Sequence, residues 1–157
     1  YAAFKIIIGK TNDELVSFID GVRAETREQP YENIAFPRGC NGVEKYFSRT
    51  DIYQKGTPIH VRGALLYNHY VKKNKIENKY PLIQEGEKIK FIYLKTPNPF
   101  REDCISFFNE IPKEFNMEKY IDHKKQFEKS FLKPLENVLE CIGWNSKKVV
   151  TIGSFFA

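Results

Sequence analysis

The spacing of the apolar residues changes twice along this chain, and this change constrains the fold more than any other feature of the sequence. Residues 15–22, LVSFIDGV, place apolar side chains at intervals of three and four, as on one face of a helix. Residues 88–95, KIKFIYLK, alternate instead, which is typical of a strand with one buried face. Helical spacing returns in residues 120–142. The pattern predicts an α+β fold dominated by helices, with a small antiparallel sheet in the middle.

Local signals mark both ends of the first of these helices. Thr11 and Glu14 form the pattern of a capping box, in which each side chain bonds the backbone N–H of the other residue. The Gln29-Pro30 pair predicts the end of the helix, because a residue before proline is driven out of the helical conformation. The segment that precedes Thr11, residues 1–10, fits either a strand or a short helix.

A second helix is expected after a long connection. Residues 31–57 contain Pro37, Gly39, Gly42 and Gly56 and predict mostly irregular structure. Thr57 is the expected N-cap, with Pro58 at the first helical position. The helix then continues through residues 59–75, IHVRGALLYNHYVKKNK, where Gly63 is expected to cost about 1 kcal/mol relative to Ala.

The last third of the chain predicts a strand and a long helix. Residues 104–108, CISFF, provide an antiparallel partner for the alternating segment. The final helix is expected over roughly 117–142, with a bend at Pro134, because the N–H that would bond to Ser130 is missing. Gly143 suits the position just after the helix.

Composition limits the class of protein. The chain has 157 residues, and no apolar run approaches the roughly 20 residues that a membrane-spanning helix needs. The one methionine is Met117 and the chain begins at Tyr1, so we expect a processed chain or a piece of a longer one. Three cysteines without a C-x-x-C pair favour reduced, mostly buried thiols over a zinc site or a disulfide framework. They are Cys40, Cys104 and Cys141.

Positive charge is concentrated in one part of the sequence. The formal net charge is +5, yet the segment from Lys55 to Lys95 alone carries nine basic and three acidic residues. Such a cluster is expected of a surface that meets a polyanion. A solvated, lysine-rich face that keeps a small domain soluble would have the same composition.

The sequence offers little for catalysis. Its histidines are not spaced as metal ligands, and no D-x-D pair, Walker loop or G-x-S-x-G motif occurs. We therefore expect no self-contained active site. His60 and Arg62 instead share a basic helix with Tyr67, Asn68 and Lys72, which are donors of the kind that fix a protein on phosphates.

The C-terminal end is a second functional candidate. Ile152, Phe155 and Phe156 lie at i, i+3 and i+4, so one helical turn would present all three on one side. These side chains either fold back on the core or anchor a peptide in a hydrophobic groove of a partner.

Several blocks of sequence, taken in order, carry a resemblance to a known family. Together they resemble the thumb region of the replicative family B DNA polymerases of T-even-like tailed phages, and YENIAFPRG (31–39) matches more loosely. The blocks are GTPIHVRGALLYN (56–68), EGEKIKFIYLK (85–95), NPF (98–100), CISF (104–107), YID (120–122), QFEKSFLKPL (126–135) and SFF (154–156).

The resemblance implies a right-hand polymerase whose thumb grips the primer–template duplex. The catalytic aspartates, with Mg²⁺ in the palm of the parent polymerase, would then precede Tyr1, as would the proofreading carboxylates. We therefore expect no catalytic residue, metal site or cofactor in this fragment, which should be inactive by itself. The expected partners are duplex DNA, the sliding clamp and the other domains of the parent polymerase, in the cytoplasm of an infected bacterium and without a membrane.

The resemblance also implies a division of the chain. Residues 1–144 would form the thumb and residues 145–157 a clamp-binding tail. The run IGSFF (152–156) is similar to clamp-binding peptides, which combine an aliphatic residue, two spacers and two aromatics. The chain departs from this pattern at Val149, where many such peptides carry Gln.

Nine residues are the candidates for DNA contact, because they are donors or cations within the basic segment. A free-standing basic nucleic-acid-binding protein and a structural module with solubilising lysines remain the alternatives. The nine candidates are His60, Arg62, Tyr67, Asn68, Lys72, Lys73, Lys88, Lys90 and Lys95.

Overall fold

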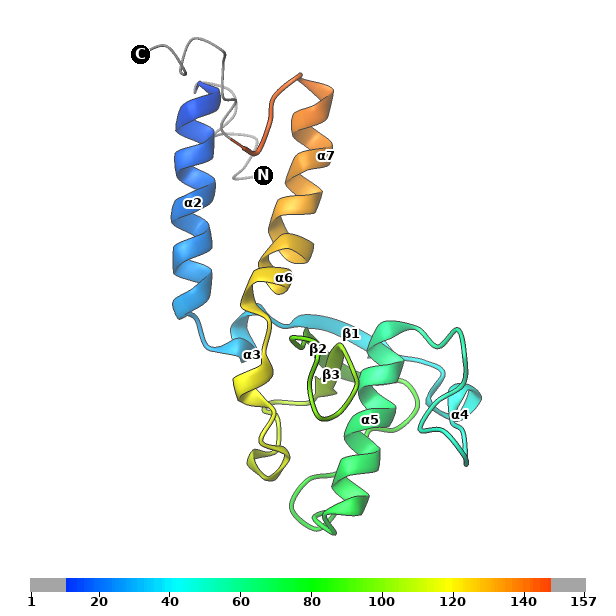
Figure 1. The fold of residues 1–157 in the computed structure, drawn as a ribbon. Helices are drawn as coiled ribbons and strands as arrows, with labels where there is room; N and C mark the ends of the chain where they lie inside the picture. Colours follow the sequence, from blue (N-terminus) through cyan, green and yellow to red (C-terminus); the bar gives the residue numbers. More distant parts are fainter. Residues whose placement is uncertain (1–10, 148–157) are drawn as a thin grey trace. The chain divides into compact units, whose positions relative to one another are not determined.

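A computed structural model describes residues 11–147 and divides the chain into two compact units (Figure 1). The helical unit combines the N-terminal part up to Gln29 with the part from Phe127 onwards, and the sheet unit is Pro30–Gln126. The sequence did not indicate this division. No helix within residues 11–147 combines the length and the apolar composition that crossing a membrane requires.

The first helix of the helical unit has the expected ends. Helix α2 spans Asn12–Glu28 and is followed by an extended Gln29. The backbone N–H of Glu14 donates to Thr11 Oγ1 at 3.4 Å, and the N–H of Thr11 donates to Glu14 Oε2 at 3.3 Å. The predicted capping box is therefore confirmed.

The expected single helix over 117–142 is wrong at its N-terminal end. Two 3₁₀ turns, η1 (Lys113–Phe115) and η2 (Glu118–Tyr120), precede helix α6 (His123–Phe127). Asn116, with a φ of 53°, and the extended Ile121 each interrupt the helical path. The apolar spacing continues through these turns, so periodicity alone did not reveal the breaks.

Pro134 is accommodated by a change of helix type. A π-helical turn, Glu128–Leu132, directly precedes helix α7 (Lys133–Cys141), and the Lys133 N–H donates to the carbonyl of Glu128. The wider turn relieves the clash that a proline ring makes with the carbonyl four residues earlier. The effect of the proline was expected as a bend and is observed as a local widening.

Helix α7 ends as the sequence predicted, and it closes a small core. Gly143 has a φ of 73°, and its N–H donates to the Glu140 carbonyl at 3.2 Å, while the Trp144 N–H donates to the Leu139 carbonyl at 3.0 Å. These two bonds form a Schellman motif. The apolar faces of α2 and α7, which run side by side in Figure 1, share a core of Leu15, Ile19, Phe127, Leu135 and Leu139.

The sheet unit contains three antiparallel strands in the order β1-β2-β3, which confirms the α+β fold class. Strand β2 (Glu87–Tyr93) pairs with β3 (Cys104–Phe107), as expected, and with β1 (Phe36–Cys40), which was not expected. Strand β1 contains Pro37 and Gly39, both unfavourable inside a sheet, and β1 lies at an edge where proline is tolerated.

Besides η1, η2 and most of α6, the sheet unit contains three further helices. Helices α3 (Tyr31–Ile34) and α4 (Val43–Tyr46) lie in the region expected to be irregular. Helix α5 spans Ile59–Lys73, so it begins one residue later than predicted and ends two residues earlier. The hydroxyl of Thr57 donates to the Gln54 carbonyl at 2.5 Å, so Thr57 does not cap the helix and Pro58 takes the N-cap position.

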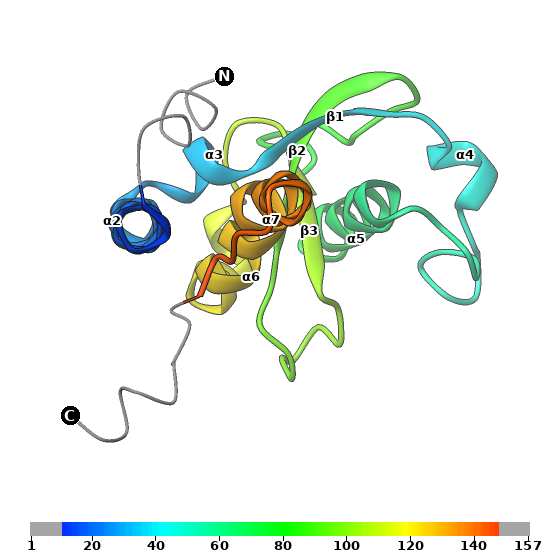
Figure 2. The ribbon, with the colours of Figure 1, turned by 90° about the horizontal axis from the view of Figure 1, so that it is seen from above.

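Helix α5 lies against the sheet beside β3 (Figure 2). Gly63 is a point of close approach between the helix and this strand. A Cβ atom on Gly63 would lie 2.5 Å from Ser106 Oγ and 2.7 Å from the backbone nitrogen of Ser106. The Ser106 hydroxyl also donates to the His60 carbonyl at 2.7 Å. Gly63 is therefore required by the packing, whereas the sequence had suggested only a mild penalty.

We predict that Gly63→Ala lowers the free energy of unfolding by about 1–3 kcal/mol, because the added methyl group overpacks the contact with Ser106. Gly21→Ala is the matched control, since a Cβ atom there meets nothing within 4 Å. That change should raise stability by about 0.5–1 kcal/mol through helix propensity. Denaturant unfolding measures both values, and equal effects of the two substitutions would contradict the packing argument.

Candidate nucleic-acid interface

The positive charge of the chain belongs to one unit. Pro30–Gln126 contains seventeen Lys and Arg and twelve Asp and Glu, whereas the remaining residues contain eight of each. The sheet unit thus carries the whole net charge of +5. A surface that meets a polyanion is expected on this unit.

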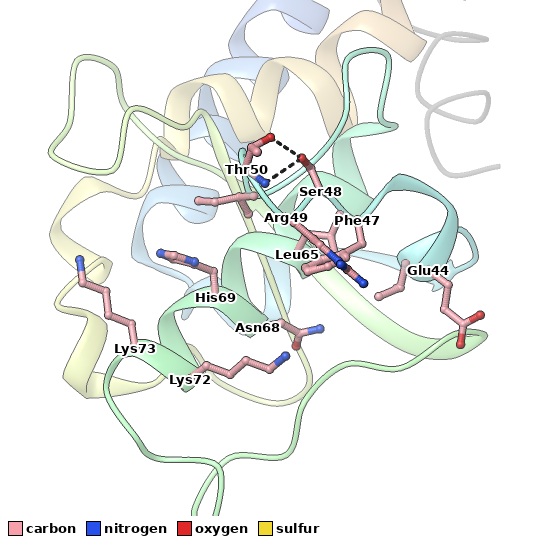
Figure 3. Close-up of a pocket in the computed structure, with 12 residues that line it drawn as sticks. Glu44, Phe47, Ser48, Arg49, Thr50, Leu65, Asn68, His69, Lys72 and Lys73 are labelled. Atoms are coloured by element: carbon pink, nitrogen blue, oxygen red, sulfur yellow. Dashed lines mark hydrogen bonds between the residues drawn. The ribbon is translucent and has the colours of Figure 1, made fainter.

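A hollow of about 770 Å³ opens between helix α5 and the segment around the end of α4 (Figure 3). We call it the α5 hollow. Its floor is apolar, and its polar rim includes three cations and one carboxylate. It is lined by Val43, Glu44, Phe47, Ser48, Arg49, Thr50, Ile52, Leu65, Asn68, His69, Lys72 and Lys73.

Hydrogen bonds hold the segment that forms one wall of the α5 hollow. The hydroxyl oxygen of Ser48 accepts from the backbone N–H groups of Thr50, at 3.3 Å, and Asp51, at 3.1 Å. The side-chain amide of Gln54 donates to the carbonyls of Lys45 and Phe47, both at 3.1 Å. These hydrogen bonds therefore give this segment a defined conformation.

Unpaired cations surround the α5 hollow. Arg49, Lys72 and Lys73 face one carboxylate, Glu44, across the lining, and none of the three cations forms an ion pair with a residue in the described part of the chain. Lys72 and Lys73 also occupy the last turn of α5, where cations stabilise the helix dipole. Phe47, at 51% exposure, adds an accessible aromatic ring. The hollow can accept an anion beside a flat apolar group.

Among the predicted DNA-contact residues, Asn68, Lys72 and Lys73 line this hollow. The Asn68 side chain is engaged within the protein, because its Nδ2 donates to the Ile83 carbonyl and its Oδ1 accepts from the Ile83 N–H, both at 2.8 Å. Tyr67 is 1% exposed, and its hydroxyl donates to the Pro81 carbonyl at 3.2 Å. Burial raises the pKa of Tyr67 to about 12. Both side chains therefore stabilise the segment that follows α5.

His60 and Arg62, near the start of α5, do not line the α5 hollow. Arg62 Nη2 lies 2.8 Å from Asp103 Oδ1, and Lys125 Nζ lies 3.6 Å from the other oxygen of the same carboxylate. Burial, together with the charge of Arg38, lowers the pKa of His60 below its usual value of 6.5. His60 is therefore neutral near pH 7 and offers a hydrogen bond but no charge.

The three lysines of the strand region are also dispersed. Lys88 lines a separate hollow of about 700 Å³ that also contains Glu32, Glu87 and Glu110. Lys90 Nζ donates to the Glu32 carbonyl at 3.0 Å. Lys95 is exposed, just after the end of β2. The nine candidates do not converge on one surface, and DNA contact by any of them stays a prediction.

Sequence reasoning missed Phe47, Arg49 and His69 as neighbours of Lys72 and Lys73. Phe47 and Arg49 precede the basic segment in sequence and lie in a region expected to be irregular. The available signal was an aromatic residue followed by the polar run SRT, residues 48–50, but nothing local links this run to the end of α5.

Two further expectations concern other parts of the chain. The tail residues Ile152, Phe155 and Phe156 lie outside the described residues. Within residues 11–147, no group of three or more His, Cys, Asp or Glu side chains is arranged to hold a metal ion.

Comparison with known proteins tests the resemblance. No protein-family model matches the chain. The DNA-directed DNA polymerase of Enterobacteria phage T4 is 28% identical over 154 residues, which cover 96% of this chain and 17% of the polymerase. The chain is similar to part of a phage DNA polymerase. The DNA-directed DNA polymerase of Escherichia phage RB69 is 29% identical over 135 residues, which cover 83% of this chain and 14% of that protein.

These two matches confirm the resemblance to phage DNA polymerases over nearly the whole chain. The chain spans less than a fifth of the length of either polymerase. It therefore corresponds to a fragment of these relatives.

We predict that Asn68→Ala destabilises the chain by about 2–4 kcal/mol, because it leaves the buried N–H and carbonyl of Ile83 without their partner. Asn78→Ala is the control, since Asn78 is an exposed amide beyond the end of α5. Thermal unfolding of both variants measures the difference. A stable Asn68→Ala variant would show that this amide is free for other contacts.

Proposed function

We propose that this chain is the thumb region of a family B, phage-type DNA-directed DNA polymerase, acting in the cytoplasm of an infected bacterium. The observation that carries the proposal is the similarity to the T4 polymerase across 96% of the chain. The concentration of the entire net positive charge in the sheet unit supports contact with DNA.

The proposed task of the thumb is to grip the primer–template duplex by its phosphates. A polymerase must accept every sequence, and phosphate contacts position a protein without reading bases. Lys72, Lys73, Lys88 and Lys95 suit this role best among the candidates, because they are exposed. Their charges form no ion pair with another residue of the part that the structure describes.

Catalysis is proposed to lie in other domains of the parent polymerase. Mg²⁺ and its aspartates would belong to the palm, and the fragment would be inactive by itself. Within the described residues, no cluster of metal-ligating side chains occurs. Its contribution would be to hold the duplex while the palm performs nucleotidyl transfer.

We predict that the chain binds a duplex of about 20 base pairs with an affinity that falls steeply between 50 and 200 mM salt, because each neutralised phosphate releases a counterion. Replacing Lys72 and Lys73 by Ala should weaken binding equally for different sequences. It should also make the slope of log affinity against log salt shallower by about 2. Fluorescence anisotropy on two unrelated duplexes measures both effects.

A double variant with the same change in charge provides the control. Lys113→Ala with Lys119→Ala removes two exposed lysines whose sequence neighbours, Glu114 and Glu118, are acidic. This variant should retain the original slope. A salt-independent affinity would contradict the thumb proposal, and a marked preference for one duplex would favour a free-standing nucleic-acid-binding protein.

We also propose that the C-terminal tail docks on the sliding clamp. The support for this is the IGSFF pattern, with Ile152, Phe155 and Phe156 as its apolar anchors. Such a peptide would bind by placing its aliphatic and aromatic side chains in a hydrophobic groove.

We predict that Phe155→Ala combined with Phe156→Ala abolishes binding to the sliding clamp of a T-even-like phage and leaves duplex affinity unchanged. Surface plasmon resonance with immobilised clamp measures the first, and anisotropy measures the second. Val149→Gln is the matched gain-of-function variant, because it restores the usual residue of clamp-binding peptides. Reduced thermal stability of the double variant would instead show that the two rings pack on the core.

A further inference from the structure

The Phe47 ring in the α5 hollow has no evident structural role. Phe47 follows the short helix α4 and is 51% exposed, whereas Leu65 and Val43, which line the same hollow, are buried. Among the described residues, the other large hydrophobic side chain exposed to this degree is Ile142, which belongs to the helical unit. Phe47 is thus the accessible aromatic ring of the hollow.

Three cations line the hollow together with this ring. Arg49 is two residues from Phe47 in the chain, and Lys72 and Lys73 belong to the last turn of α5; all four residues line the hollow. In Figure 3 Lys73 lies farther from Phe47 than Arg49 does, and its Nζ lies 5.4 Å from the centroid of the Tyr70 ring. The planar guanidinium of an arginine suits phosphate oxygens, and lysines add positive charge without demanding a particular geometry. One aromatic ring beside several cations is the combination found where proteins bind single strands.

The backbone that carries Phe47 is held in place before any ligand arrives. The Gln54 amide fixes the Phe47 carbonyl at 3.1 Å, and the Gln54 N–H donates to the Tyr46 carbonyl at 2.9 Å. Phe47 also pairs with Tyr53 in an isolated antiparallel bridge, and the Tyr53 hydroxyl donates to Glu102 Oε1 at 2.5 Å. A site that is already ordered loses little conformational entropy on binding.

We propose that the α5 hollow binds single-stranded nucleic acid, with one base stacked on Phe47 and the neighbouring phosphates held by Arg49, Lys72 and Lys73. A duplex does not meet this description, because its bases are stacked inside and have no free face for Phe47. A protein partner is disfavoured, because specific protein interfaces bury roughly 800 Å² on each side and their centres are depleted of charged residues, whereas three cations line this hollow. The ligand proposed for this site, a single strand, thus differs from the duplex that the thumb is proposed to grip.

Two ligands with the same number of phosphates test the proposal. The intact chain should bind a labelled twelve-residue oligothymidylate about 5- to 150-fold more tightly than an abasic oligomer of equal length, which is the range for stacking of one base. Phe47→Ala should abolish this preference, whereas Arg49→Ala should weaken binding of both oligomers. Ile142→Ala removes the comparably exposed side chain of the helical unit and should change neither affinity.

A tryptophan at the same position provides a direct readout of stacking. Phe47→Trp should retain the preference, and its fluorescence should be quenched by oligothymidylate but not by the abasic oligomer. The original chain, with Trp144 in the other unit, supplies the baseline. Circular dichroism and thermal unfolding confirm that each variant is folded.

Three results would overturn the proposal. They are equal affinity of the original chain for the two oligomers, an unchanged preference in Phe47→Ala, and a Phe47-dependent affinity for a Glu-rich peptide that exceeds the affinity for oligothymidylate. Duplex affinity is measured on the same variants. It should be unaffected by Phe47→Ala, so failure of this proposal and failure of the duplex grip give different results.

Discussion

The close contact between helix α5 and strand β3 at Gly63 is the constraint on which the rest of the sheet unit depends. Without a Cβ atom, the helix backbone approaches Ser106 closely enough for the Ser106 hydroxyl to donate to the His60 carbonyl. This approach buries the apolar face of α5 against a strand whose own residues are all buried. The position of α5 then determines which of its polar side chains reach solvent and which are used inside the protein.

The polar residues of α5 consequently divide into two groups. Arg62 and Asn68 are engaged by Asp103 and by the backbone of Ile83, so they stabilise neighbouring segments. Lys72 and Lys73, in the last turn, remain exposed and unpaired within the described residues, and they face the wall that carries Phe47 and Arg49. The same helix therefore serves as a structural element along most of its length and as a candidate binding surface at its C-terminal end.

The similarity to two phage polymerases and the structure of the chain indicate different aspects of its function. The similarity relates the chain to a class of enzyme that works on DNA, but it distinguishes no contact residue. The structure places the net charge in one unit and brings three cations and one exposed ring into the lining of one hollow. A duplex grip by dispersed lysines and a single-strand site in the α5 hollow use different chemistry, because only the second requires a free base.

The sequence by itself determined the features that depend on neighbours within a few residues. These are the capping box at Thr11, the end of α2 before Pro30, the alternation in β2 and the glycine after α7. Only the tertiary structure decided the features that depend on distant partners. Strand β1 forms despite Pro37 because β2 offers it an edge, and Gly63 is required because Ser106 lies against it. The α5 hollow brings residues 47–50 next to residues 72 and 73. A local sequence pattern does not indicate which distant side chains will be neighbours, because tertiary packing determines these contacts.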